Sequence, residues 1–209
     1  ENSGAMDSWI VGVSKSIGQY VCFLDSDDVL NENYFEELDR ILLNNDPDII
    51  VFNYNRFYEN GIIEIKENSS NGYIDDGLLN DIKKDYFLNY KKYSMYRWNK
   101  LFKGKIIREV SKQINFRVTY FEDLYIGLLM LINSSKIYLL ETCLYNYRMR
   151  SNSVSKSVNE KVFSDNRKMY DELLKYMNNE FSNEAISNMK DYMDYGYIRY
   201  YLRDSSKNQ

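Results

Sequence analysis

The sequence predicts an α/β fold, in which a mixed sheet is flanked by helices and followed by a helical tail. Short apolar runs between turn residues predict strands, and apolar residues at helical spacing predict helices. Both patterns occur within residues 1–155, whereas the remainder is dominated by helical spacing. We therefore expect a sheet-containing domain over residues 1–155 and a helical extension over residues 156–209.

Each element is predicted from its local pattern. Residues 1–18 carry three glycines and predict a loop, a short helix and a turn. The predicted strands are 20–24, which we expect to be buried, 48–53, a strand or hairpin over 55–66 around Asn60-Gly61, and one or two strands over 137–148. The predicted helices are 31–44, 77–90, 105–112, 123–133 and two amphipathic helices over 159–203. We expect loops over 69–77 and 151–158.

The composition excludes several classes of function. The net charge is −4 at pH 7, and no basic block suggests a nucleic-acid surface. No apolar run approaches the ~20 residues that span a bilayer. The chain contains no histidine, which excludes Ser-His-Asp and Cys-His catalysis and leaves acid–base chemistry to carboxylates, lysine or tyrosine. Cys22 and Cys143 lie in apolar runs and are expected to be small core residues.

Three carboxylates follow the first predicted strand, at Asp25, Asp27 and Asp28. In open α/β sheets, ligands bind beyond the carboxyl ends of the strands. A divalent ion such as Mg²⁺ or Mn²⁺ would neutralise acids that otherwise repel one another, and it commonly bridges carboxylates to phosphates. The alternative is that these acids cap the following helix. We expect Asp25 and Asp27 to bind metal and Asp28 to turn toward that helix.

Two further polar groups are candidates for a site. Glu122 and Asp123 precede an apolar helix, where they could cap its start or present a general base. Arg148 and Arg150 stand before a serine-rich stretch and could close over a phosphate, or form a solvated basic loop.

The short segment Trp98-Asn99-Lys100 lies between apolar neighbours. It could be a structural corner with Trp98 in the core, or it could contribute to a binding site. We expect Lys100 to be charged and therefore unsuited to act as a base.

Several motifs together resemble the family 2 glycosyltransferases of bacterial cell-surface polysaccharide synthesis, which have the Rossmann-like GT-A fold. The resemblance covers about residues 1–155. It rests on Glu1, Asn2, Gly4, Gly12, Gly18 and Tyr20 ahead of F-L-D-S-D-D, on W-N-K-L-F at 98–102, on the acidic pair ending at Asp123, and on Y-R-x-R-x-x-S over 147–153.

The resemblance implies transfer of a sugar from a nucleotide-sugar donor, such as a UDP-sugar, to an acceptor hydroxyl with inversion. Asp25 and Asp27 would bind Mn²⁺ or Mg²⁺ and the donor, and Arg148 and Arg150 would approach its diphosphate. Asp123 would be the base.

In the same comparison Glu122 would support the base. The segment Trp98, Asn99 and Lys100 would lie on the acceptor side. The acceptor would be a glycan or a lipid-linked glycan.

The resemblance also implies a preceding strand–helix–strand unit that binds the nucleotide base and that is absent from this sequence. We expect a cytoplasmic protein, with the inner face of the membrane as an alternative location. The tail helices are expected to pack on the core or on a partner, and a peripheral membrane contact or a homodimer through them is the further alternative.

Two other functions compete with this one. The run from Phe23 to Leu30 also fits the start of haloacid-dehalogenase-like phosphatases, in which Asp25 would be a nucleophile and Asp27 a general acid. A catalytically inactive, truncated transferase that serves as an interaction domain is the non-enzyme alternative.

Overall fold

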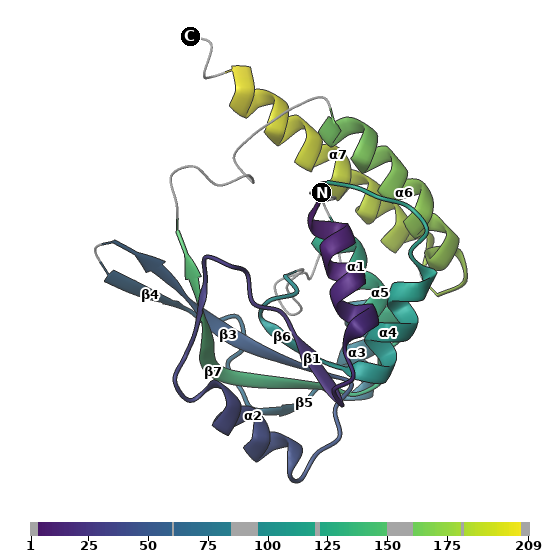
Figure 1. Cartoon of the computed structure of the whole chain (residues 1–209). Helices are drawn as coiled ribbons and strands as arrows, with labels where there is room; N and C mark the ends of the chain where they lie inside the picture. The colour runs from purple at the N-terminus through teal and green to yellow at the C-terminus, as the bar shows by residue number, and fades with distance from the viewer. Residues whose placement is uncertain are drawn as a thin grey trace.

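A mixed β-sheet organises the molecule (Figure 1). The structure is a computed structural model that describes residues 4–59, 61–84, 96–119, 122–149, 161–180 and 182–205. Within these residues the sheet has seven strands, and its main path runs β1-β6-β3-β7-β2. The strands are β1 (Tyr20–Cys22), β2 (Val29–Leu30), β3 (Ile49–Tyr58), β4 (Gly61–Ile65), β5 (Gly72–Tyr73), β6 (Lys100–Lys103) and β7 (Ile137–Arg148).

The centre of the sheet is the parallel pair of β3 and β7, and the other pairings are antiparallel. The hairpin predicted around Asn60-Gly61 is confirmed, because β4 returns along β3, although Asn60 lies outside the described residues. The predicted strands 48–53 and 55–66 are thus one long strand and its partner. The register between β3 and β7 shifts at Asn53, whose buried amide binds the backbone of Asn68 and Glu141.

The first strand differs from its prediction. β1 ends at Cys22 instead of residue 24, and its residues are half-buried instead of fully buried. It pairs with β6 alone, at one end of the described sheet. The apolar run predicted a strand correctly, but an edge position leaves one side of it without a neighbouring strand.

Helices cover both faces of the sheet. The chain forms α1 (Ala5–Lys15), α2 (Tyr34–Leu42), α3 (Asp76–Lys84), α4 (Gly104–Gln113), α5 (Glu122–Ile132), α6 (Lys161–Glu180) and α7 (Asn183–Ser205). Side chains of α1, α4 and α5 pack on one face in a large apolar cluster, and α2 packs on the other (Figure 1). The predicted helix 31–44 starts later, at Tyr34, because Asn31 is still bonded to β7, through its backbone N–H to Leu144 and through its side chain to the carbonyl of Cys143.

The helical tail packs on the core, as predicted. Met169 of α6 and Met189 and Met193 of α7 are buried in the same apolar cluster as α5. The division at residue 155 stays a prediction.

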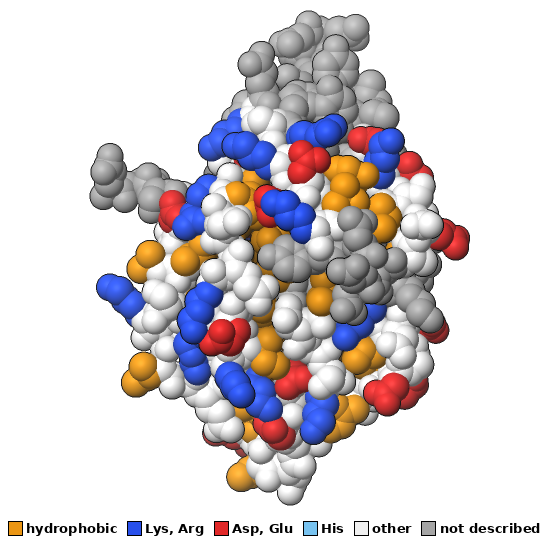
Figure 2. Space-filling view, turned by 90° about the vertical axis from the view of Figure 1, so that its right-hand side faces the viewer, with side chains coloured by type: hydrophobic (Ala, Val, Ile, Leu, Met, Phe, Trp, Pro, Cys, Tyr) orange, Lys and Arg blue, Asp and Glu red, His pale blue; other side chains and the backbone are white. Residues whose placement is uncertain are grey.

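No helix among the described residues is both long enough and apolar enough to cross a bilayer. On the face drawn in Figure 2, basic and acidic side chains are interspersed.

Candidate active site

The acidic loop after β1 is held against β7 by Asp28. One carboxylate oxygen of Asp28 accepts a hydrogen bond from the Tyr145 hydroxyl at 2.8 Å, and the other accepts one from the backbone N–H of Arg148 at 2.7 Å. The same hydroxyl accepts a hydrogen bond from the backbone N–H of Asp25 at 3.1 Å. The expectation that Asp28 turns toward α2 is therefore wrong, because β7 offers it two donors.

With Asp28 committed to the fold, Asp25 and Asp27 are the acids left at the strand end. The side chain of Asp25 is 40% exposed, so a ligand can reach it. The Nε of Arg148 donates to the backbone carbonyl of Asp27 at 2.7 Å, and its guanidinium lies 4.9 Å from the centre of the Phe57 ring. Arg148 thus lies at the turn of the acidic loop, whereas Arg150 lies outside the described residues.

A single guanidinium joins this loop to the start of α5. Arg97 lies 3.9 Å from a carboxylate oxygen of Asp25 and 3.7 Å from one of Glu122, and it makes its closest ion pair with Asp123. Only 13% of the Arg97 side chain is exposed. We call Asp25, Glu122 and Asp123 the carboxylate cluster. The sequence interpretation missed Arg97, whose one available signal was its position directly before the W-N-K segment.

Electrostatics within the carboxylate cluster are governed by burial. Burial, reinforced by the charge of Asp123, raises the pKa of Glu122 to about 7. Burial also raises the pKa of Asp123 above its usual range, while Arg97 acts in the opposite direction. Both acids stand in the first turn of α5, where the positive end of the helix dipole favours their ionised forms. Burial outweighs this effect, so the carboxylate pair is more basic than ordinary surface acids.

The segment predicted to contact an acceptor is buried. Trp98 stacks on Tyr96, Tyr145 and Tyr147, with ring centres 4.9, 4.8 and 5.3 Å from its own. Asn99 and Lys100 are also fully buried. The structural interpretation, with Trp98 in the core, is confirmed, and the acceptor-binding role stays a prediction.

Lys100 differs from its expected state. Its ammonium donates to the Asn99 side chain at 2.8 Å and to the carbonyl of Tyr96. Complete burial lowers the pKa of Lys100 to about 7. The expectation that Lys100 is charged does not hold in full near neutral pH, because the burial of this strand residue depends on the whole fold and has no local sequence signal.

The fold and the site together define a class of protein. It is an α/β protein in which acids at a strand end face a second acidic pair across one guanidinium. The model of the family described as "Glycosyl transferase family 2" matches residues 1–121. The chain belongs to this family, and membership removes the ground for the phosphatase alternative.

Relatives agree with this assignment. The chain is 28% identical over 178 residues to Glycosyltransferase GlyA of Streptococcus pneumoniae, covering 77% of this chain and 23% of that protein. It is 26% identical over 159 residues to Glycosyltransferase GlyG of the same organism, covering 74% of this chain and 52% of that protein. The chain thus spans about a quarter to a half of the length of these relatives.

Among solved structures, the chain is similar to residues 1–349 of S. aureus TarS in complex with UDP-GlcNAc. The TM-score is 0.62 at 16% identity, with 91% of this chain and 51% of that chain covered. The GT-A-like fold expected from the sequence is confirmed by this likeness.

Proposed function

We propose that this chain is part of the catalytic domain of a glycosyltransferase that moves a sugar from a nucleotide-sugar donor to an acceptor hydroxyl with inversion. A UDP-sugar is the first donor to test, because the structurally similar TarS was solved with UDP-GlcNAc and with UDP. The acceptor class is a glycan or a lipid-linked glycan of the bacterial surface. Such an enzyme would work in the cytoplasm or at the inner face of the membrane.

One observation carries the proposal: Arg97 touches acids from both halves of the site. Because its guanidinium reaches both Asp25 and Asp123, the acid at the strand end and the acid at the start of α5 lie within the span of one planar group. A single-displacement transfer needs this closeness, since the donor must stand between the group that binds its diphosphate and the base that activates the acceptor.

The residues present fit a divalent cation. Asp25 and Asp27 supply the hard oxygen ligands that Mg²⁺ and Mn²⁺ prefer, and the accessible carboxylate of Asp25 leaves room for other ligands. No cluster of three or more His, Cys, Asp or Glu side chains suited to a metal occurs among the described residues. Mg²⁺ is commonly held by one or two carboxylates together with substrate phosphates, so two acids suffice. A bound ion would offset the charge on the leaving diphosphate.

Asp123 is the proposed base, with Glu122 in support. An acceptor hydroxyl must lose its proton as the new bond forms, and a positioned carboxylate accelerates such a step by about 10²–10⁴-fold. The ion pair with Arg97 fixes the Asp123 carboxylate in one orientation. Asp25 and Asp27 would hold the donor, and Arg148 and Arg150 would approach its diphosphate.

Calorimetry tests the donor side. We expect full-length protein to bind Mn²⁺ more tightly with UDP than without it, and Asp27→Ala to lose most of this gain. Asp39→Asn, an acid on α2, is the control. Equal affinity in Asp27→Ala and in the unmodified protein would remove Asp27 from the metal site.

Substitution of the base tests the chemistry. Asp123→Asn keeps the shape and the capping ability of the side chain but removes its basicity. With UDP-sugar and an acceptor glycan supplied, we expect transfer to fall by about 10²–10⁴-fold while UDP binding stays close to that of the unmodified protein. The melting temperature falls as well, because Arg97 then keeps only Glu122 and the more exposed Asp25 as counter-charges. Transfer within a factor of a few would show that Asp123 is only a cap. Activity absent even from the unmodified protein would favour the inactive interaction domain.

A further inference from the structure

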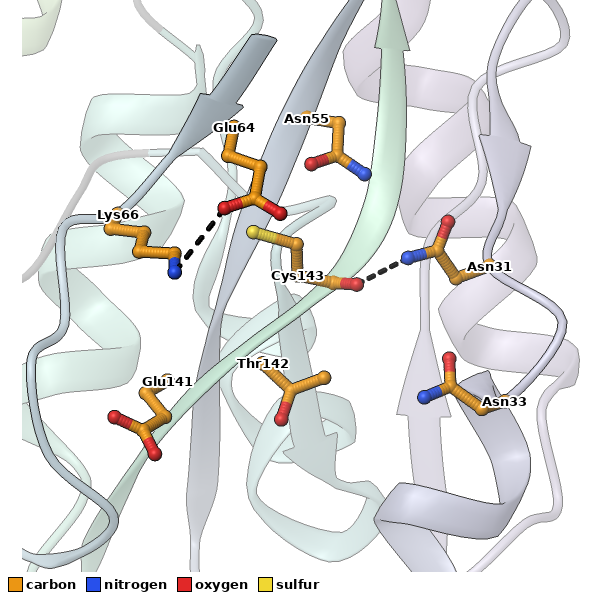
Figure 3. A pocket seen from close by; sticks show the side chains of 8 residues that line it. All are labelled: Asn31, Asn33, Asn55, Glu64, Lys66, Glu141, Thr142 and Cys143. Atoms are coloured by element: carbon orange, nitrogen blue, oxygen red, sulfur yellow. Dashed lines mark hydrogen bonds and ion pairs between the residues drawn. The ribbon is translucent and has the colours of Figure 1, made fainter. Parts of the chain in front are cut away.

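A polar groove opens beside the active site, on the α2 face of the sheet. It lies between β4, β3 and β7 on one side and the start of α2 on the other, with a volume of about 480 Å³ (Figure 3). This volume is within the range of small-molecule sites. All eight side chains that line the groove carry a polar group or a thiol, and none is aliphatic or aromatic. A ligand here would therefore be recognised by hydrogen bonds.

A chain of three asparagine amides begins at Asn55 and ends at Asn31, both of which line the groove. Asn55 donates to Asn146 at 2.8 Å, Asn146 donates to Asn31 at 2.6 Å, and Asn31 donates to the carbonyl of Cys143. The chain leaves the side-chain oxygen of Asn55 without a hydrogen-bond partner among the residues that the structure describes, although this residue is only 8% exposed. A buried acceptor without a donor is costly, so a ligand hydroxyl that reached it would be stabilised there.

Other polar groups of the groove are also available. The side chains of Asn33 and Thr142 make no hydrogen bond with any residue that the structure describes. Asn33 directly precedes α2, and Thr142 lies on β7. An amide and a hydroxyl can each donate and accept. Together with Asn55 they present both kinds of partner from three different elements.

The charges of the groove argue against an anionic ligand. Lys66 is paired with Glu64 at 3.2 Å, and Glu141 accepts a hydrogen bond from Asn71 at 3.0 Å. With two acids and one lysine, the lining carries no excess positive charge to attract a phosphate. A neutral, hydroxyl-rich ligand fits both the polar lining of the groove and its lack of excess positive charge.

We propose that the groove is a subsite for a neutral carbohydrate unit, separate from the transfer site. The choice of carbohydrate rests on the proposed function, whereas the polar and uncharged character of the ligand rests on the groove itself. Cys143 stands two residues before Tyr145, and two residues span about 7 Å along a strand. The hydroxyl of Tyr145 binds the acidic loop. A glycan seated in the groove would thus run alongside the donor site, as a distal unit of an acceptor chain.

The thiol of Cys143 reports occupancy of the groove. Burial raises the pKa of this thiol, so alkylation by iodoacetamide is followed at alkaline pH. Cys22 on β1 is the internal control, because it is a free cysteine of similar burial that does not line the groove. Chitotetraose and maltotetraose are the neutral probes, and UDP is the anionic one. Mass spectrometry gives the rate for each cysteine in the same protein.

We expect at least one neutral oligosaccharide to slow alkylation of Cys143 by about threefold at a concentration of twice its Kd, with the rate at Cys22 unchanged. Thr142→Val, which keeps the shape and favours a strand, should lose this protection. Protection by neither oligosaccharide, or protection by UDP alone, would overturn the subsite. The transfer function is judged separately by Asp123→Asn, so either proposal can fail without the other.

Discussion

Arg97→Met removes the positive charge that lies within 4 Å of all three acids of the carboxylate cluster. Methionine keeps much of the side-chain volume, so the change is chiefly electrostatic. The variant leaves Glu122 and Asp123 side by side at the start of α5, together with Asp25, and without their shared partner. We expect a marked loss of stability.

The size of the loss follows from the distances. At an effective dielectric constant of about 20, charges 3.7 to 3.9 Å apart attract by about 4 kcal/mol, before desolvation is counted. The contribution of Asp25 is smaller than this, because its carboxylate is 40% exposed and screened by water. Removing one partner of a largely buried pair costs about 3–5 kcal/mol, so we expect a loss of about 2–4 kcal/mol in the free energy of unfolding near neutral pH.

Urea unfolding at several pH values measures this effect and its cause. Without Arg97, the folded-state pKa values of Glu122 and Asp123 rise further above their unfolded values. An acid with a raised folded-state pKa loses stability as the pH rises through that value, and it loses none where both states are protonated. The difference between the variant and the unmodified protein should therefore be largest near about pH 8 and shrink toward about pH 5.

A matched control separates this effect from the loss of any arginine. Arg40 also contacts a glutamate, Glu37, but 68% of its side chain is exposed. Arg40→Met should change stability by less than about 0.5 kcal/mol, with little dependence on pH. If Arg97→Met destabilised the protein no more than Arg40→Met, or by the same amount at every pH, the role of Arg97 as counter-charge would be refuted.

Two further predictions concern other buried charges. Burial lowers the pKa of Lys100 from 10.5 to about 7, so the contribution of this residue to stability falls as the pH drops through that interval. The melting temperature of Lys100→Met, measured relative to that of the unmodified protein at the same pH, should therefore rise as the pH is lowered from about 10 to 7. A gain that did not vary with pH would contradict the burial of this amine. Asp165 on α6 accepts a hydrogen bond from the backbone N–H of Thr119 at 2.6 Å, so Asp165→Ala should cost about 1.5–3 kcal/mol in urea unfolding, whereas the exposed Asp171→Ala should cost less than about 0.5 kcal/mol. Equal costs for Asp165→Ala and Asp171→Ala would argue against the idea that α6 anchors the backbone at Thr119.

The long periodic elements could be predicted from the sequence, and the short ones could not. The helices α4 and α5 and the strand β7 match their predictions to within about one residue, because their apolar patterns are long enough to have a period. β2 and β5 have two residues each, and both exist through their pairing with β7. Such strands depend on partners far along the chain, which no local pattern contains.

The site shows the same limit. The acids were predicted because strand ends and helix starts can be located from local sequence. Arg97 was missed because its role depends on bringing it to Asp25 and Asp123, which are distant in the chain. The ionisation of Lys100 was predicted wrongly for the same reason, since burial is set by the whole fold.

The amide chain from Asn55 through Asn146 to Asn31 makes the groove insensitive to pH and salt, whereas the neighbouring transfer site is sensitive to both. Amides carry no charge and do not titrate, so neither acid nor salt weakens their hydrogen bonds directly. The opposite side, around Arg97, depends on ionised groups and responds to both. Mild acidification would therefore change the charge of the Glu122–Asp123 pair while leaving the hydrogen bonds of this amide chain unchanged, so the transfer site and the groove beside it would respond differently to the same change in pH.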